Sequence, residues 1–153
     1  MSTADRLAEL GLTIPEVAAP VAAYVPAVLT GQYVYTAGQL PFVDGALSVT
    51  GKVGAAVDAD AATAQARVAA LNALAAVQSV AGSLDRVARV VKVTVFVASD
   101  PSFTGQPAVA NGASTLVGEV FGDAGVHARS AVGVAVLPLD APVEVELVVE
   151  LTD

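Results

Sequence analysis

Three segments in the second half of the chain are built mainly of valine and other small apolar residues, and they constrain the fold most. They span residues 89–97, 128–136 and 143–149. Such β-branched runs favour strands, and nearly continuous apolar strands are typical of a sheet that is buried on both faces. Because the predicted helices can cover only one face, we expect several copies of the chain to pack their open faces together.

The predicted elements follow the order β-β-α-β-α-β-β. Two short strands at 27–30 and 33–37 precede a long helix, which Asp58 or Asp60 caps and which ends at Gly82. A second helix is predicted over 103–121, and a short one over 3–10. We expect the last two strands to pair as a hairpin through the turn at 138–142. The fold class is therefore an α+β sandwich, one sheet with two helices on one face.

Composition narrows the classes of function. The formal net charge of −8 argues against binding to nucleic acid, which requires a basic surface. With no cysteine and one histidine, the chain lacks a convincing set of metal ligands. No apolar run approaches the ~20 residues that cross a bilayer, and the N-terminus does not resemble a signal peptide. We expect a cytoplasmic protein with no membrane partner, and its 14% of charged residues also favours an oligomer.

Arg129 is the first candidate for function. It opens an otherwise apolar strand and shares a face with Ala131 and Gly133. A guanidinium is a two-pronged donor that suits a carboxylate or phosphate. We interpret Arg129 as the anchor of a small anionic ligand, with Glu144 in the neighbouring strand as a candidate for chemistry beside it. The alternative is a structural ion pair between Arg129 and either Glu144 or a helix end.

Four other residues are also candidates. His127, the only histidine, could act as an acid or base at the same edge, but a polar surface position is the interpretation that we favour. Asn111 and Gly112 weaken the predicted second helix, which indicates a reason of packing or binding. Tyr24 lies in an extended segment between prolines, where it could cap a pocket or lie half-buried at the edge of the core.

Several segments occur in an order that matches a known family. They are Tyr24 after Pro20-Val-Ala-Ala, Thr36-Ala-Gly-Gln-Leu-Pro41, Val91-Lys-Val-Thr-Val-Phe-Val97, Val109-Ala-Asn111, Ala128-Arg-Ser-Ala-Val132 and Leu137-Pro-x-x-x-x-Val-Glu-Val-Glu146. From about residue 20 to 151 the chain resembles the RidA (YjgF-type) reactive-intermediate deaminases, in a longer and less characterised branch. The resemblance implies a single RidA-like domain over 1–153, with 1–19 as an N-terminal extension. It also implies a chorismate-mutase-like fold and a homotrimer with a cleft at each subunit interface.

The resemblance also implies an activity. Members of that family hydrolyse reactive enamines and imines to 2-keto acids and ammonia, and they need no cofactor. By position, Arg129 would hold the substrate carboxylate, Glu144 would position the attacking water, and Tyr24 would belong to the cleft. Asn111 and Gly38 match further cleft positions.

Two cleft positions depart from the family pattern. Ala37 stands where the family frequently has serine, and Ala131 where it frequently has cysteine. Both substitutions remove polar contacts from the expected cleft. The alternative function is therefore non-catalytic binding of small carboxylate metabolites in the same cleft. A third, cleavage of RNA, is disfavoured by the net charge of −8.

Overall fold

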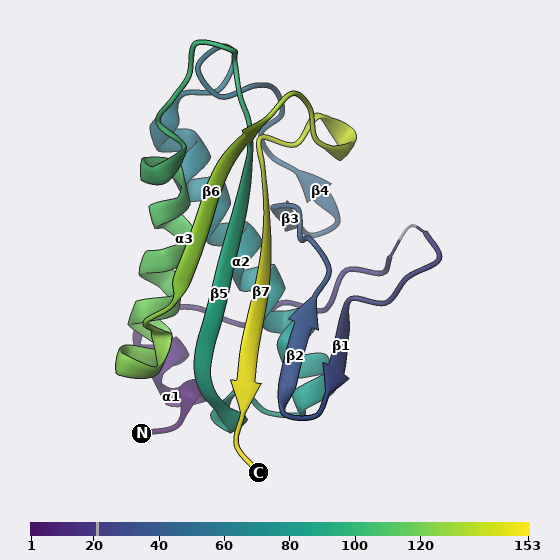
Figure 1. Cartoon of the computed structure of the whole chain (residues 1–153), viewed down its shortest axis with the longest axis vertical. Helices are drawn as coiled ribbons and strands as arrows, with labels where there is room; N and C mark the ends of the chain where they lie inside the picture. The colour runs from purple at the N-terminus through teal and green to yellow at the C-terminus, as the bar shows by residue number, and fades with distance from the viewer. Residues whose placement is uncertain (21) are drawn as a thin grey trace.

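A five-stranded sheet in the order β1-β2-β7-β5-β6 forms one layer of the computed structural model, which describes residues 1–20 and 22–153 (Figure 1). Val21, in the segment before Tyr24, lies outside the described residues. The strands of the sheet are β1 (Ala27–Thr30), β2 (Tyr33–Thr36), β5 (Val87–Ala98), β6 (Ala128–Val134) and β7 (Val143–Leu151). The predicted α+β class and element order are confirmed.

The predicted pairing of the last two strands is wrong. β5 lies between β6 and β7, parallel to β6 and antiparallel to β7. The connection over residues 135–142, with the short 3-10 helix Pro138–Asp140, crosses the end of β5. Hairpin loops rarely exceed about five residues. The sequence predicts a five-residue turn, but β6 ends at Val134, so the connection is longer than a hairpin loop.

Two long helices cover one face of the sheet, as predicted (Figure 1). Helix α2 (Ala59–Ala81) begins after Asp58, whose carboxylate accepts from the Ala61 amide at 2.7 Å, and ends at Gly82, where φ is 83°. Helix α3 (Gln106–Phe121) lies beside α2 and has a proline in its first turn. The short helix α1 (Thr3–Glu9) begins with a capping box between Ser2 and Asp5. The starts of α1 and α2 thus follow from local capping contacts.

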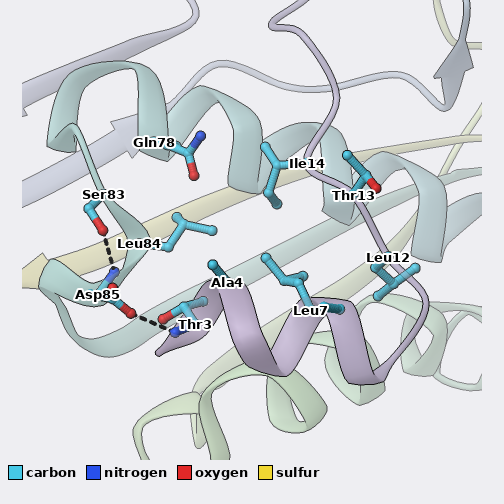
Figure 2. A pocket seen from close by; sticks show the side chains of 11 residues that line it. Thr3, Ala4, Leu7, Leu12, Thr13, Ile14, Gln78, Ser83, Leu84 and Asp85 are labelled. Atoms are coloured by element: carbon cyan, nitrogen blue, oxygen red, sulfur yellow. Dashed lines mark hydrogen bonds between the residues drawn. The ribbon is translucent and has the colours of Figure 1, made fainter. Parts of the chain in front are cut away.

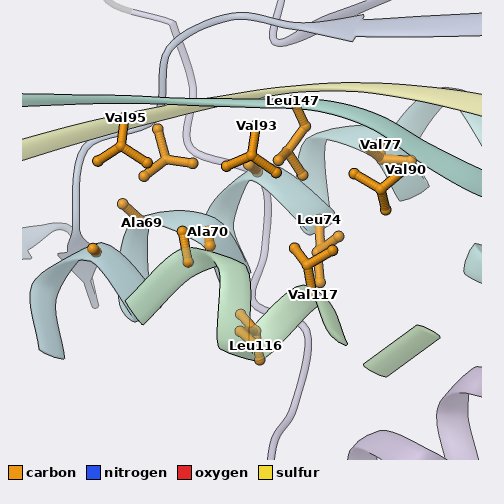
Figure 3. Packing of buried hydrophobic residues seen from close by; sticks show 14 of the residues in the cluster. Ala69, Ala70, Leu74, Val77, Val90, Val93, Val95, Leu116, Val117 and Leu147 are labelled. Atoms are coloured by element: carbon orange, nitrogen blue, oxygen red, sulfur yellow. The ribbon is translucent and has the colours of Figure 1, made fainter. Parts of the chain in front are cut away.

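The core lies between the sheet and α2 and α3. Alternate residues of β5 and β7 point toward the helices and are fully buried, among them Val93, Val95 and Leu147 (Figure 3). They meet small side chains of α2 such as Ala69 and Ala70. Because the α2 side chains at this contact are small, the valine side chains of the sheet pack against them while the two layers stay close together.

A glycine lets α2 and α3 approach each other. A Cβ on Gly112 would overlap the backbone carbonyl oxygen of Thr63 in α2. The sequence indicates a reason of packing or binding for Asn111 and Gly112 in this helix. The close approach of α2 is the packing reason for Gly112. The same contact holds α3 beside the edge of the sheet formed by β6. Asn111, which precedes Gly112, faces that edge.

The opposite face of the sheet is open and apolar. Large side chains on it include Val28, Tyr33, Tyr35 and Val132, whose exposed fractions are 52%, 41%, 50% and 44%. They belong to β1, β2 and β6, so the apolar surface reaches both edges of the sheet. Exposed apolar surfaces of this kind mark places where proteins associate.

A second, two-stranded sheet lies beyond β2. It consists of β3 (Phe42–Val43) and β4 (Ala46–Leu47), and its turn residues Asp44 and Gly45 both have positive φ. Asp44 and Gly45 form the two-residue turn of this small hairpin. Within the described part of the chain, no helix has the length and apolar character needed to cross a membrane.

Candidate functional site

Arg129 is the second residue of β6, which forms one edge of the sheet. It is in register with Val93, a buried residue that points toward the helices. Paired residues on neighbouring strands point to the same face. The Arg129 side chain therefore lies on the helix-covered side, at the margin where α3 meets the sheet edge.

The partners of the Arg129 guanidinium are neutral. Its Nη1 donates to Oδ1 of Asn111 at 2.7 Å and to Oγ of Ser114 at 3.2 Å, both in α3. No salt bridge of Arg129 occurs in the part of the chain that the structure describes. The alternative of a structural ion pair is thus not observed, and the positive charge remains available to an anion.

His127 is part of the same network. Its Nε2 is 2.9 Å from Oγ of Ser114, and its Nδ1 is 2.6 Å from the carbonyl oxygen of Gly125. His127 is half-buried at the junction between a loop and β6, and these two contacts give it a defined place in the network. Sequence reasoning also missed Ser114, although it follows Asn111 by three residues and so shares its helix face.

Glu144 lies elsewhere on the sheet. It is the second residue of β7 and is in register with Phe96 of β5, on the open face. Burial, and to a smaller extent the Glu146 carboxylate, raises the pKa of the Glu144 carboxyl above its ordinary value. A Cβ on Gly38 would overlap Oε1 of Glu144, so only glycine at position 38 leaves the carboxylate where it is.

The residues around Glu144 form a connected set. Gln39 exchanges backbone hydrogen bonds with Val145 at 2.8 and 3.0 Å, which places Ala37 and Gly38 beside the start of β7. The Ala37 amide donates to the Pro26 carbonyl at 2.7 Å. This hydrogen bond connects the segment that carries Tyr24 to the loop after β2. Tyr24 itself is 50% exposed.

The candidate residues therefore form two groups rather than one site. We call Asn111, Ser114, His127, Arg129 and Ala131 the Arg129 group, and Tyr24, Ala37, Gly38 and Glu144 the Glu144 group. Each group takes the name of its charged residue. Strand β5 separates the two groups, and Arg129 and Glu144 point to opposite faces of the sheet. The expectation that these two side chains meet within one chain is wrong, because it depended on the incorrect hairpin.

The cavity under α1 lies away from both groups. Figure 2 shows a cavity of about 320 Å³ that is lined by α1, residues 12–14, Gln78 and residues 83–85. It contains no residue of either group. Among the described residues, no cluster of three or more His, Asp or Glu side chains could hold a metal ion.

Residues 4–151 match the protein-family model described as "YjgF/chorismate mutase-like, putative endoribonuclease". The chain is 48% identical over 151 residues to Protein TCP17 of Trypanosoma cruzi, an alignment that covers 98% of this chain and 94% of that protein.

Solved structures give the same match. A protein of unknown function from Agrobacterium tumefaciens is 44% identical, with a TM-score of 0.91 over 98% of this chain and 92% of the other. RidA from an Antarctic Psychrobacter is 29% identical, with a TM-score of 0.61 over 89% of this chain and 94% of the other. The chain thus resembles the first structure more closely than it resembles RidA.

Proposed function

Because the chain belongs to the YjgF/RidA family, we propose that it is an enzyme that hydrolyses small 2-imino or enamine acids to 2-keto acids and ammonia. The observation that carries this proposal is the Arg129 guanidinium, which is held by two neutral side chains at the edge of the sheet. Guanidinium groups bind carboxylates through charge-assisted, two-pronged hydrogen bonds. A substrate with a carboxylate beside its reacting carbon fits such an anchor.

We propose that the complete site forms between copies in a homotrimer. A substrate of a few carbon atoms cannot reach both faces of one sheet, so Arg129 and Glu144 of one chain cannot act on the same molecule. An assembly in which the open face of one copy meets the β6 edge of the next would bring the Glu144 group of the first copy to the Arg129 group of the second. The exposed Tyr35 and Val132 supply apolar surface for this contact.

In the proposed reaction, Arg129 holds the carboxylate so that the neighbouring imine carbon lies close to a water molecule. Positioning of this kind can lower a barrier by about 7 kcal/mol or more. Glu144 accepts one proton from the water as the water oxygen bonds to the imine carbon, and it passes this proton to the nitrogen to give a carbinolamine. It then accepts the hydroxyl proton and delivers it to the nitrogen as the C=O bond forms and the C–N bond breaks, so both protons of the water leave in ammonia. The raised pKa of Glu144 brings it closer to the working pH, which favours proton transfer in both directions.

The direct test is ammonia release from 2-aminoacrylate generated in the assay. Arg129→Ala should abolish the rate above the uncatalysed background, because the carboxylate anchor is gone. Arg89→Ala, which removes an exposed arginine of β5, is the matched control and should keep the full rate. An unchanged rate in Arg129→Ala would reject the proposed role of the guanidinium.

The same assay addresses the alternatives. Saturable binding of pyruvate without imine hydrolysis would favour a module that binds small carboxylates. The family description also names an endoribonuclease, but a net charge of −8 opposes binding to a polyanion. Salt-sensitive binding to single-stranded RNA would support that third function, and a flat titration at low salt would reject it.

A further inference from the structure

We propose that Ser114 and His127 are positioning residues that turn the Nε–Nη2 edge of Arg129 toward the substrate carboxylate. This inference rests on the proposed function, since it assigns how the anchor of that site is oriented. It adds two residues that the sequence analysis did not assign to substrate binding.

The first step concerns the donors of Arg129. A guanidinium has five N–H groups, two of them on Nη1. Asn111 and Ser114 accept from Nη1, one neutral oxygen for each of its protons. Among the described residues, neither Nε nor Nη2 has a hydrogen-bond partner. These two atoms form an edge that matches both oxygens of a carboxylate.

The second step concerns the direction of the hydrogen bonds. The Gly125 carbonyl can only accept, so the proton in its 2.6 Å contact with His127 must belong to Nδ1. In the neutral imidazole, Nε2 is then an acceptor and receives the proton of the Ser114 hydroxyl at 2.9 Å. The lone pairs of Ser114 Oγ are left to accept from Arg129.

The hydrogen bonds therefore run in one direction, from Arg129 through Ser114 and His127 to the backbone. Their end point is rigid, because Gly125 is buried and packs directly against the backbone of Val117 in α3. Asn111 holds the guanidinium from a second point on α3. Two anchors on one atom restrict rotation of the guanidinium, which is the preorganisation that a binding edge needs.

The first experiment determines the direction of the hydrogen bonds and does not depend on an activity assay. His127 is the only histidine, so ¹⁵N-histidine labelling of the whole protein yields one imidazole. At slightly alkaline pH we expect Nδ1 to be protonated and Nε2 to be unprotonated. The opposite tautomer would overturn the proposed network.

The second experiment tests whether Ser114 and His127 position the Arg129 guanidinium for substrate binding. Ser114→Ala should lower kcat/KM for 2-aminoacrylate about tenfold, the size of effect that follows the loss of one hydrogen bond to a charged group, and should weaken pyruvate binding similarly. Ser114→Thr keeps the hydroxyl and should restore both values. His127→Phe should act like Ser114→Ala, whereas His127→Gln keeps an acceptor for the Ser114 hydroxyl and should retain most of the activity.

A double-mutant cycle separates positioning from a general structural effect. In the Arg129→Ala background, Ser114→Ala should cause no further loss of residual pyruvate binding, because its effect passes through the guanidinium. Wild-type values in Ser114→Ala, or an equal loss in both backgrounds, would overturn the inference. If the wild-type protein neither hydrolyses the imine nor binds pyruvate, the proposed function fails and this inference fails with it. The tautomer measurement would still show whether the network itself exists.

Discussion

Burial of the Glu144 carboxyl links its pKa to the stability of the fold. Its carboxylate is partly withdrawn from water on the open face, so its pKa in the folded chain lies above the value in the unfolded chain. The folded state then binds the proton more tightly, and the penalty on stability grows as the pH rises through the folded-state pKa. The charged form is the one that folding disfavours.

We expect Glu144→Gln to raise the free energy of unfolding at neutral pH, with a gain that fades as the pH falls below the ordinary range of a glutamate. Imine hydrolysis should fall by about 10²-fold or more, the usual contribution of a general acid–base group. Urea unfolding at several pH values measures the first effect. Glu150→Gln on the same strand is the control for hydrolysis and should keep its rate. A stability difference that does not change with pH would contradict the burial argument.

Gly38, in the loop that follows β2, lies against the same carboxylate. Gly38→Ala would place a methyl group where Oε1 of Glu144 lies, and the end of a flexible side chain can move away at little cost. We expect the unfolding temperature to change little while hydrolysis falls at least about tenfold, because a catalytic group must be held within about 0.5 Å. In the Glu144→Gln background, Gly38→Ala should cost nothing more. A further loss there would show that Gly38 acts by another route.

At the scale of elements, local signals predicted the helices and strands but not the partner of each of the last two strands. Asp58 and Gly82 mark the ends of α2 because capping involves groups within one turn of the helix. Alternation along β6 correctly placed Arg129 on one face with Ala131 and Gly133. The pairing of β6 with β5 depends on contacts between segments far apart in sequence, and no residue in either strand specifies it.

The contact between α2 and α3 can be tested with two glycines of one helix. Gly112→Ala should destabilise the fold by about 1–3 kcal/mol, because its Cβ would overlap a backbone oxygen of α2 that cannot move alone. Gly118→Ala has no atom within 4 Å of its Cβ and should instead stabilise by up to about 1 kcal/mol. Urea unfolding of both variants gives the comparison. Equal effects would show that helix propensity, and not the close approach, determines the cost at position 112.

At the scale of the whole molecule, the apolar open face and the divided site lead to the same expectation. Tyr35→Glu introduces a charge on the open face and should convert a trimer into monomers in sedimentation equilibrium. Hydrolysis should be lost with the assembly. Ala64→Glu adds the same charge to an exposed position of α2 and should leave both properties unchanged. A wild-type monomer with full activity would contradict the shared site.

Mixing two inactive variants tests the shared site directly. Arg129→Ala keeps the Glu144 group and Glu144→Gln keeps the Arg129 group, so a mixed trimer should regain complete sites. With random mixing in equal amounts, about one quarter of the interfaces of a cyclic trimer would be intact. Recovery of about that share of the wild-type rate after joint refolding is the expected result. A mixture that stays inactive would contradict a site that combines Arg129 of one copy with Glu144 of another.

The sequence by itself determined which segments are helices and strands, which faces are apolar, and that Arg129 and Glu144 are the charged residues that need an explanation. These properties depend on periodicity, capping and composition, which act over a few residues. Only the tertiary structure decided that β5 separates the two charged side chains, that Asn111 and Ser114 accept from the guanidinium, and that Gly112 brings the helices together. Each of these depends on the distance between residues remote in the chain, which is set when strands pair and layers pack.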